Sequence, residues 1–203
     1  MVDEDKRATL RRFAAAGAAV STGLTGTAAA SESDTREALV GYVTQTPGAH
    51  FSKIRDDLQL GTGETQYHLR QLEDSGTVTS RSDGAYRRYF PADQFDTFEQ
   101  TALGYLRRET PRQMLFALLE TPGQTGADLV SQVDVARSTV STHASALTEA
   151  GLIERDSGGY RVQYPETVVA LVLRYAESFG DEAVRFASDA DRLLSYDPPA
   201  REL

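Results

Sequence analysis

The sequence contains no cysteine and no tryptophan, and it has only three histidines and two methionines among its 203 residues. The absence of cysteine excludes disulfide frameworks, cysteine-ligated zinc, iron–sulfur clusters and a thiol nucleophile. Three histidines leave little material for a histidine-rich metal site, so we expect no metal and no other cofactor. Hydrophobic residues make up 40% of the chain, which fits one large or two small domains with their own cores.

Lysine is also scarce, because Lys6 and Lys53 stand against 19 arginines. The 30 acidic residues outnumber the 21 basic ones and give a net charge of −9. An acid excess with few lysines resembles proteins of extreme halophiles, in which strong salt screens charges beyond about 3 Å and acidic groups serve solubility. The net charge then says little against DNA binding. The stretch 34–91 carries eight acidic and seven basic residues, so it can hold a local basic face.

The first 30 residues have the order of an export signal. Basic residues, including the pair Arg11-Arg12, precede an uncharged run at 13–30 that ends in three alanines. The arginine pair resembles a twin-arginine signal, although Leu10 stands where serine or threonine is usual. The pattern fits an Ala-rich extension equally well, and membrane association through 13–30 is a less favoured alternative.

Comparison of the chain with itself reveals two copies of one unit. With a shift of 75 residues His68 falls on His143 and Leu72 on Leu147, and with a shift of 74 the Tyr-Arg pair at 86–87 falls on another at 160–161. The repeat divides the chain into an Ala-rich extension at 1–33, a first module at 34–91, a linker helix at 92–109, a second module at 110–165 and C-terminal helices at 166–203.

Hydrophobic periodicity predicts the same elements in both copies. The first copy has a helix after Asp34, a short helix around Ile54, a third helix at 62–76 capped by Thr62, and a β-hairpin at 77–90. The second copy has the corresponding elements, with Pro111 at the first position of its first helix and the others at 127–133, 138–150 and 152–164. Three helices followed by a hairpin predict a winged helix-turn-helix. The expected fold class is therefore mainly α with small β-hairpins (α+β): two tandem winged helix-turn-helix modules plus linker and C-terminal helices.

Parts of both modules resemble known regulators. The sequence S-T-V-S-T-H at 138–143, with G-L-I at 151–153, resembles the recognition helix of ArsR/MarR-type regulators. The segments 66–76 and 86–91 resemble winged-helix regulators of halophilic archaea. The resemblance departs at Ala144, where leucine is usual, and the metal-sensing cysteines of some ArsR proteins are missing. It implies a sequence-specific, DNA-binding transcription regulator without that metal-sensing route.

The third helix of each copy (62–76 and 138–150) and the first wing (77–90) are expected to contact double-stranded DNA. A helix fits the major groove, where glutamine pairs with adenine and arginine with guanine, while other polar groups contact phosphate. We expect the first copy to dominate binding. The candidate DNA-binding residues are Lys53, Arg55, Thr62, Gln66, Tyr67, His68, Arg70, Gln71, Arg81, Arg87, Arg88, Arg137, Ser138, Thr139, Ser141, Thr142, His143 and Arg161.

Structural interpretations stand beside these assignments. His68 and His143 fit half-buried structural positions on their helices as well as phosphate contacts. The pair at 87–88 fits a solvated strand face. Glu64 is expected to stabilise the N-terminus of its helix, so it is not counted as a DNA contact.

Other functions and assemblies follow from the remaining features. The sequence has no P-loop, no G-x-S-x-G and no H-E-x-x-H, so we expect no enzyme. The alternative function is a winged-helix scaffold for protein–protein contact, including a membrane-tethered one.

Apolar stripes at 167–179 and 181–196 favour a homodimer, with docking onto the modules as the alternative. Because DNA lies inside the cell, we expect a cytoplasmic protein, with export or tethering as the alternative.

Overall fold

The computed structural model describes residues 2–17 and 29–190. The chain divides into two units, Met1–Gly104 and Tyr105–Leu203. The boundary between them falls inside helix α5 (Thr97–Leu106), which lies in the range expected to hold a linker helix. Among the described residues, helices predominate and the strands form small antiparallel sheets, so the predicted fold class is confirmed.

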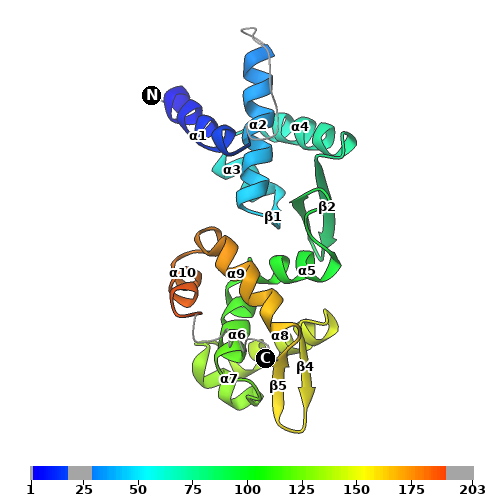
Figure 1. The fold of residues 1–203 in the computed structure, drawn as a ribbon, viewed down its shortest axis with the longest axis vertical. Helices are drawn as coiled ribbons and strands as arrows, with labels where there is room; N and C mark the ends of the chain where they lie inside the picture. Colours follow the sequence, from blue (N-terminus) through cyan, green and yellow to red (C-terminus); the bar gives the residue numbers. More distant parts are fainter. Residues whose placement is uncertain (1, 18–28, 191–203) are drawn as a thin grey trace, which may run out of the picture. The chain divides into compact units, whose positions relative to one another are not determined.

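Within its described residues, the first unit contains four helices before α5, together with a three-stranded antiparallel sheet (Figure 1). The sheet has the order β1-β3-β2, so the strand that returns from the wing lies in the middle. The helices are α1 (Val2–Gly17), α2 (Ala29–Gln45), α3 (Phe51–Asp57) and α4 (Thr62–Asp74), and the strands are β1 (Ala49–His50), β2 (Val78–Asp83) and β3 (Tyr86–Pro91).

The helix-turn-helix is formed by α3 and α4, and local hydrogen bonds determine where each helix begins. His50 caps α3, because its Nδ1 accepts a hydrogen bond from the backbone N–H of Lys53 at 3.2 Å. The N-cap of α4 is Gly61, not Thr62 as expected, and the Glu64 carboxylate accepts the Gly61 N–H at 3.4 Å. Glu64 therefore occupies the position predicted for it at the start of the recognition helix.

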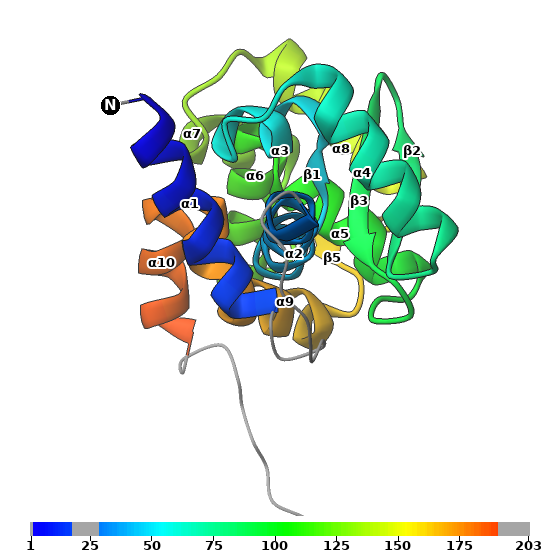
Figure 2. The same ribbon diagram turned by 90° about the horizontal axis from the view of Figure 1, so that it is seen from above.

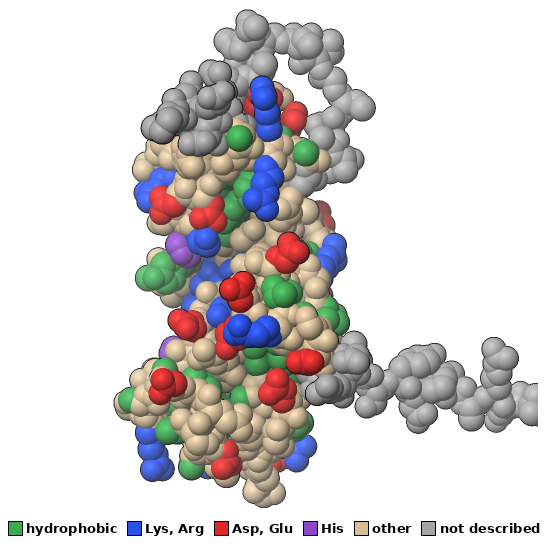
Figure 3. All heavy atoms as spheres, turned by 90° about the vertical axis from the view of Figure 1, so that its left-hand side faces the viewer, with side chains coloured by type: hydrophobic (Ala, Val, Ile, Leu, Met, Phe, Trp, Pro, Cys, Tyr) green, Lys and Arg blue, Asp and Glu red, His purple; other side chains and the backbone are tan. Residues whose placement is uncertain are grey.

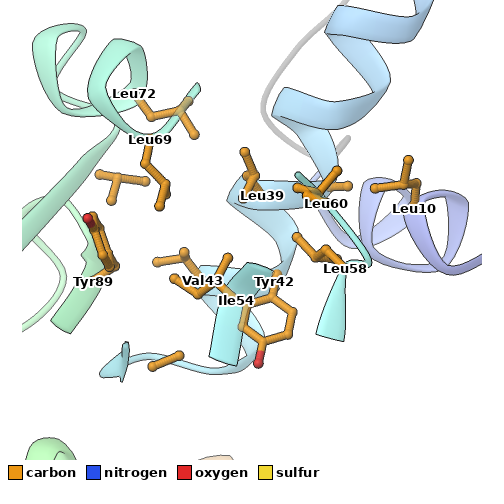
Figure 4. Close-up of a cluster of buried hydrophobic side chains, with 13 residues drawn as sticks. Leu10, Leu39, Tyr42, Val43, Ile54, Leu58, Leu60, Leu69, Leu72 and Tyr89 are labelled. Atoms are coloured by element: carbon orange, nitrogen blue, oxygen red, sulfur yellow. The ribbon is translucent and has the colours of Figure 1, made fainter. Parts of the chain in front are cut away.

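The core of the first unit joins every layer of the module (Figure 4). Leu39, Tyr42 and Val43 of α2 meet Ile54 and the leucines around the α3–α4 turn, while α4 and β3 close the cluster from the other side. The buried side chains on α4 are Thr65, His68, Leu69 and Leu72, which leaves its opposite face exposed. Burial of one face therefore holds the helix and determines which residues it presents.

Helix α1 belongs to this core, which neither interpretation of the N-terminal segment anticipated. Leu10 is only 9% exposed and lies in the core cluster, and the ring of Phe13 packs 5.1 Å from that of Tyr42. Figure 2 shows α1 alongside α2, which is seen nearly end-on. Most of the uncharged run at 13–30 lies outside the described residues. Within the described part of the chain, no helix combines the length and apolarity needed to span a membrane.

The second unit, as far as it is described (up to residue 190), repeats the module and adds two C-terminal helices. Pro111 is the third residue of its first helix rather than the first, because that helix begins two residues earlier than predicted. The elements are α6 (Glu109–Glu120), α7 (Gly126–Gln132), α8 (Arg137–Glu149), β4 (Ile153–Asp156), β5 (Gly159–Val162), α9 (Pro165–Phe179) and α10 (Asp181–Ser188).

The C-terminal helices pack within their own unit. The ring of Phe186 on α10 stacks on that of Phe116 on α6, with centroids 4.1 Å apart. Arg107 donates to the carbonyl of Ser178 at 2.5 Å, and its guanidinium lies 4.4 Å from the ring centroid of Phe179. Part of the apolar surface that suggested a homodimer is thus used inside one chain.

Candidate nucleic-acid interface

Helix α4 presents a polar face to solvent. Gln66, Tyr67 and Arg70 are exposed, and 53% of Tyr67 is accessible. These residues lie opposite the leucines that anchor the helix to the core. The predicted recognition face is therefore available to a ligand along its first two turns.

A groove runs between this face and the wing. It is lined by side chains from three elements: Phe51 of α3, Thr62, Gln66, Arg70 and Glu73 of α4, and Arg87 and Tyr89 of β3. Of the predicted DNA-binding residues, the fold brings Thr62, Gln66, Arg70 and Arg87 together here. A long amide and two guanidinium groups in one open groove are suited to base edges and phosphate oxygens.

Arg87 is tied to the recognition helix by a small polar network. Its Nη2 donates to Glu73 Oε1 at 2.7 Å, and its Nε donates to the hydroxyl of Ser80 at 2.6 Å. The Ser80 hydroxyl in turn donates to Glu73 at 2.5 Å. The network holds the wing and helix in a fixed relation, while 59% of the Arg87 side chain remains accessible. Beneath it, burial raises the pKa of Tyr89.

Arg88 is not part of this surface, contrary to the prediction. Only 3% of it is accessible, because β3 is the central strand and its side chain lies under the wing. Arg88 forms an ion pair with Asp83 and donates to the carbonyl of Gly48 at 2.9 Å. A Cβ at Gly104 would approach Arg88 Cδ to 3.2 Å, so the glycine makes room for this buried cation. Arg88 links the wing to the body of the module.

His68 is also buried, which favours the structural interpretation over the predicted phosphate contact. It is 4% exposed, and its Nδ1 has no hydrogen-bond partner among the described residues. Burial is the main cause that lowers the pKa of His68, so the neutral ring is the form that suits this position. The aromatic neighbour on its own helix, Tyr67, remains on the exposed side.

Other predicted residues of the first unit are engaged in intramolecular contacts. Lys53 pairs with Asp57 at 2.7 Å and Arg55 with Asp56 at 2.7 Å. The other two residues lie elsewhere on the module: Gln71 accepts a hydrogen bond from Arg36 at 3.0 Å, and Arg81 donates to the carbonyl of Thr97 at 2.9 Å and to the hydroxyl of Thr101 at 2.7 Å. Exposed ion pairs are weak, so the two α3 cations can exchange a carboxylate for phosphate at little cost.

The second module exposes hydroxyl groups. Arg137, Ser138, Ser141 and Thr142 of α8 are exposed, whereas Thr139 and His143 are partly buried. In its wing, Arg161 pairs with Asp156 of the same hairpin at 3.1 Å. On the face shown in Figure 3, basic and acidic side chains are interspersed over each unit rather than gathered into a single basic patch.

Sequence reasoning missed four residues that shape the first groove. Phe51 and Tyr89 form part of its wall, and Glu73 and Ser80 orient Arg87. Glu73 lies one turn after Arg70 on α4, so helical spacing places both on the same side. The contact between Glu73 and Ser80 joins a helix to a strand, and the sequence carries no local signal for it.

Comparison with known proteins agrees with this architecture. A family model described as an N-terminal HTH domain matches residues 33–103, and one described as winged helix-turn-helix DNA-binding matches residues 107–154. The chain carries two winged helix-turn-helix domains in tandem. An uncharacterized HTH-type transcriptional regulator of Methanocaldococcus jannaschii is 26% identical over 131 residues, or 64% of this chain. The chain spans about a third (33%) of the length of that curated relative.

These tandem winged helix-turn-helix domains confirm the predicted type of module. The ArsR/MarR subtype and the halophilic origin stay predictions. The module boundaries, including the linker at 92–109, stay predictions.

Proposed function

We propose that the protein is a DNA-binding transcription regulator that places α4 in a major groove and the β2–β3 wing on the neighbouring backbone. The observation that carries this proposal is the open groove in which Gln66 and Arg70 of the recognition helix meet Arg87 of the wing. The match to a DNA-binding domain family and the relative's description as a transcriptional regulator support it. Nothing in the groove favours the protein–protein scaffold.

Each side chain of the groove has a distinct role in this proposal. Gln66 offers a donor and an acceptor, which match the edge of adenine, and Arg70 matches guanine or a phosphate. Arg87 contacts phosphate from the wing, on the other side of the groove from α4. The remaining candidates, which are exposed or partly buried, contact the backbone: Lys53, Arg55, Thr62, Tyr67, Gln71 and Arg81 in the first module, and Arg137, Ser138, Thr139, Ser141, Thr142, His143 and Arg161 in the second.

A salt titration of DNA affinity tests the proposal. The full chain is titrated against labelled genomic duplexes at several salt concentrations, and the affinity is followed by fluorescence anisotropy. We expect log K to fall linearly with log salt, with a slope of roughly −0.9 for each phosphate contacted. Arg87→Ala makes the slope less steep by roughly 0.9, the value for one phosphate contact. Arg185→Ala, which removes an exposed arginine from α10, serves as the charge-matched control and leaves the slope unchanged. A scaffold would bind none of the duplexes.

We also propose that the protein forms a homodimer. Leu173 on α9 and Val184 on α10 are exposed apolar side chains, at 40% and 39% accessibility, and they offer surface for a second copy. Light scattering of the full chain then gives twice the chain mass of 22.1 kDa. A mass equal to one chain contradicts it.

We also propose that the protein keeps its N-terminus and acts in the compartment that holds DNA. Leu10 and Phe13 pack on the first module, so cleavage after residue 30 would remove part of that core. N-terminal sequencing of the protein from its host should find the first helix intact. A mature protein that begins at Ser31 in the medium would overturn this location.

A further inference from the structure

The recognition helices of the two modules expose different chemistry. The repeat aligns α4 with α8 at a shift of 75 residues, and the buried faces correspond, since Leu72 and Leu147 are both buried. The exposed faces do not. Where α4 exposes Gln66, Tyr67 and Arg70, α8 exposes Ser141, Thr142 and Ser145.

These side chains differ in what they can read. A glutamine or an arginine forms two hydrogen bonds with one base edge and so discriminates among base pairs. Serine and threonine hydroxyls are short, pair with either kind of base and contact phosphate oxygens, which are the same at every position. The polar face of α4 therefore suits base readout, and that of α8 suits contact with the backbone.

The two wings also differ in whether their arginine contacts the recognition helix. In the first unit Arg87 bridges to Glu73 of the recognition helix, so helix and wing present one prearranged surface. In the second unit the matching arginine, Arg161, pairs with Asp156 of its own hairpin. The residue that matches Glu73 is Thr148, whose hydroxyl donates to the carbonyl of Ala144 within α8 at 2.8 Å. Prearrangement lowers the entropic cost of binding, and it is found in the module whose recognition helix exposes Gln66 and Arg70.

We infer that the two modules divide the work on DNA: the first selects the base sequence through Gln66 and Arg70, and the second binds the backbone without sequence preference through the hydroxyls of α8. This inference rests on the proposed DNA-binding function and deepens it. It assigns the same class of ligand to both modules but a different part of that ligand to each.

The test compares matched variants of the full chain in a selection from a randomised duplex library. Arg70→Ala removes a reading side chain from the first module, and Ser141→Ala with Ser145→Ala removes two hydroxyls from the second. Among the described residues these three side chains form no hydrogen bond or ion pair, and all three are exposed. Alanine is at least as good a helix former as the residues replaced, so the helices persist.

We expect Arg70→Ala to lower affinity for the selected sequence by on the order of tenfold or more and to flatten the preference at one position. The double serine variant lowers affinity for selected and scrambled duplexes by the same factor, about two- to tenfold, and leaves the selected motif unchanged. The inference is overturned if the serine variant alters the motif as strongly as Arg70→Ala, or if Arg70→Ala leaves the motif intact. Wild-type protein that binds no duplex refutes the proposed function itself, which is a separate outcome.

Discussion

Two adjacent arginines of the wing should respond in opposite ways to truncation. Arg87 and Arg88 follow each other on β3, yet 59% of the Arg87 side chain is accessible and only 4% of the Arg88 side chain. Arg88→Ala is expected to reduce stability, whereas Arg87→Ala is expected to reduce DNA affinity. The adjacent substitution is the matched control, because both variants lose the same charge and the same side-chain length.

The magnitudes follow from the contacts of each side chain. Removal of Arg88 takes a buried cation away from the Asp83 carboxylate, removes the hydrogen bond to the carbonyl of Gly48, and creates a cavity beside Gly104. Loss of one partner of a fully buried ion pair costs about 3–5 kcal/mol. Because 24% of the Asp83 side chain is accessible to water, we place the cost near the lower end, at about 3 kcal/mol. The exposed pair of Arg87 contributes less than about 1 kcal/mol.

Urea unfolding followed by circular dichroism measures the first effect, and the slope of log K against log salt measures the second. For Arg88→Ala we expect a free energy of unfolding lowered by about 3 kcal/mol and an unchanged salt slope under conditions where the variant is folded. For Arg87→Ala we expect nearly wild-type stability and a smaller slope. If Arg88→Ala lowers the slope as much as Arg87→Ala while stability is kept, the structural role of Arg88 is refuted.

Four further substitutions, the first two as a matched pair, test the packing inside each unit. Gly159 has a φ of +118°, and a Cβ there would overlap the carbonyl oxygen of Gly123, so Gly159→Ala should lower the free energy of unfolding by about 3 kcal/mol or more. Gly151→Ala, at a φ of +71° with no atom within 4 Å of the added Cβ, should cost only about 1 kcal/mol. Equal losses for the two variants in urea unfolding contradict this. Leu10→Ala should lower the free energy of unfolding by about 2 kcal/mol, and no loss would mean that α1 is not part of the core. Burial lowers the pKa of His68 below 6.5, so the unfolded chain takes up a proton more readily and stability falls as the pH drops from about 6.5. His68→Leu should weaken this pH dependence of the free energy of unfolding. An identical pH profile in the variant excludes His68 as the source of the dependence.

Much of the fold was predictable because the decisive signals are local. The apolar stripe of α4 and its glycine-bounded ends predict a helix at 62–76, and the structure forms it over Thr62–Asp74. The wing was predicted from the Asp83-Gly84 turn between two polar strands, and β2 and β3 pair across it. Errors at the helix starts, such as Thr62 in place of Gly61, reflect competition between neighbouring caps that differ by small free energies.

What escaped prediction depends on contacts between distant segments. The two-residue strand β1 is too short to give a periodic signal, yet its pairing with β3 makes that strand central and buries Arg88. Leu10 and Phe13 are spaced for one helical face, but a weakly apolar segment does not reveal which surface it covers. The exposed residues of the groove were assigned from the helical period, while their partners Glu73 and Ser80 meet only through tertiary structure.

The internal repeat separates the residues that maintain the fold from those available to recognise a ligand. Gly76 and Gly151 match because both helices end in a left-handed residue, at φ +68° and +71°, a conformation that strongly favours glycine. Leu72 and Leu147 match because both are buried against the preceding helices. These matched glycines and leucines of the two helices thus report the shared fold and carry no information about what each module binds. The exposed positions of α4 and α8 do not match, although the two helices have the same place in their modules. Because these exposed side chains do not hold the fold, we attribute their difference to different contacts with the ligand.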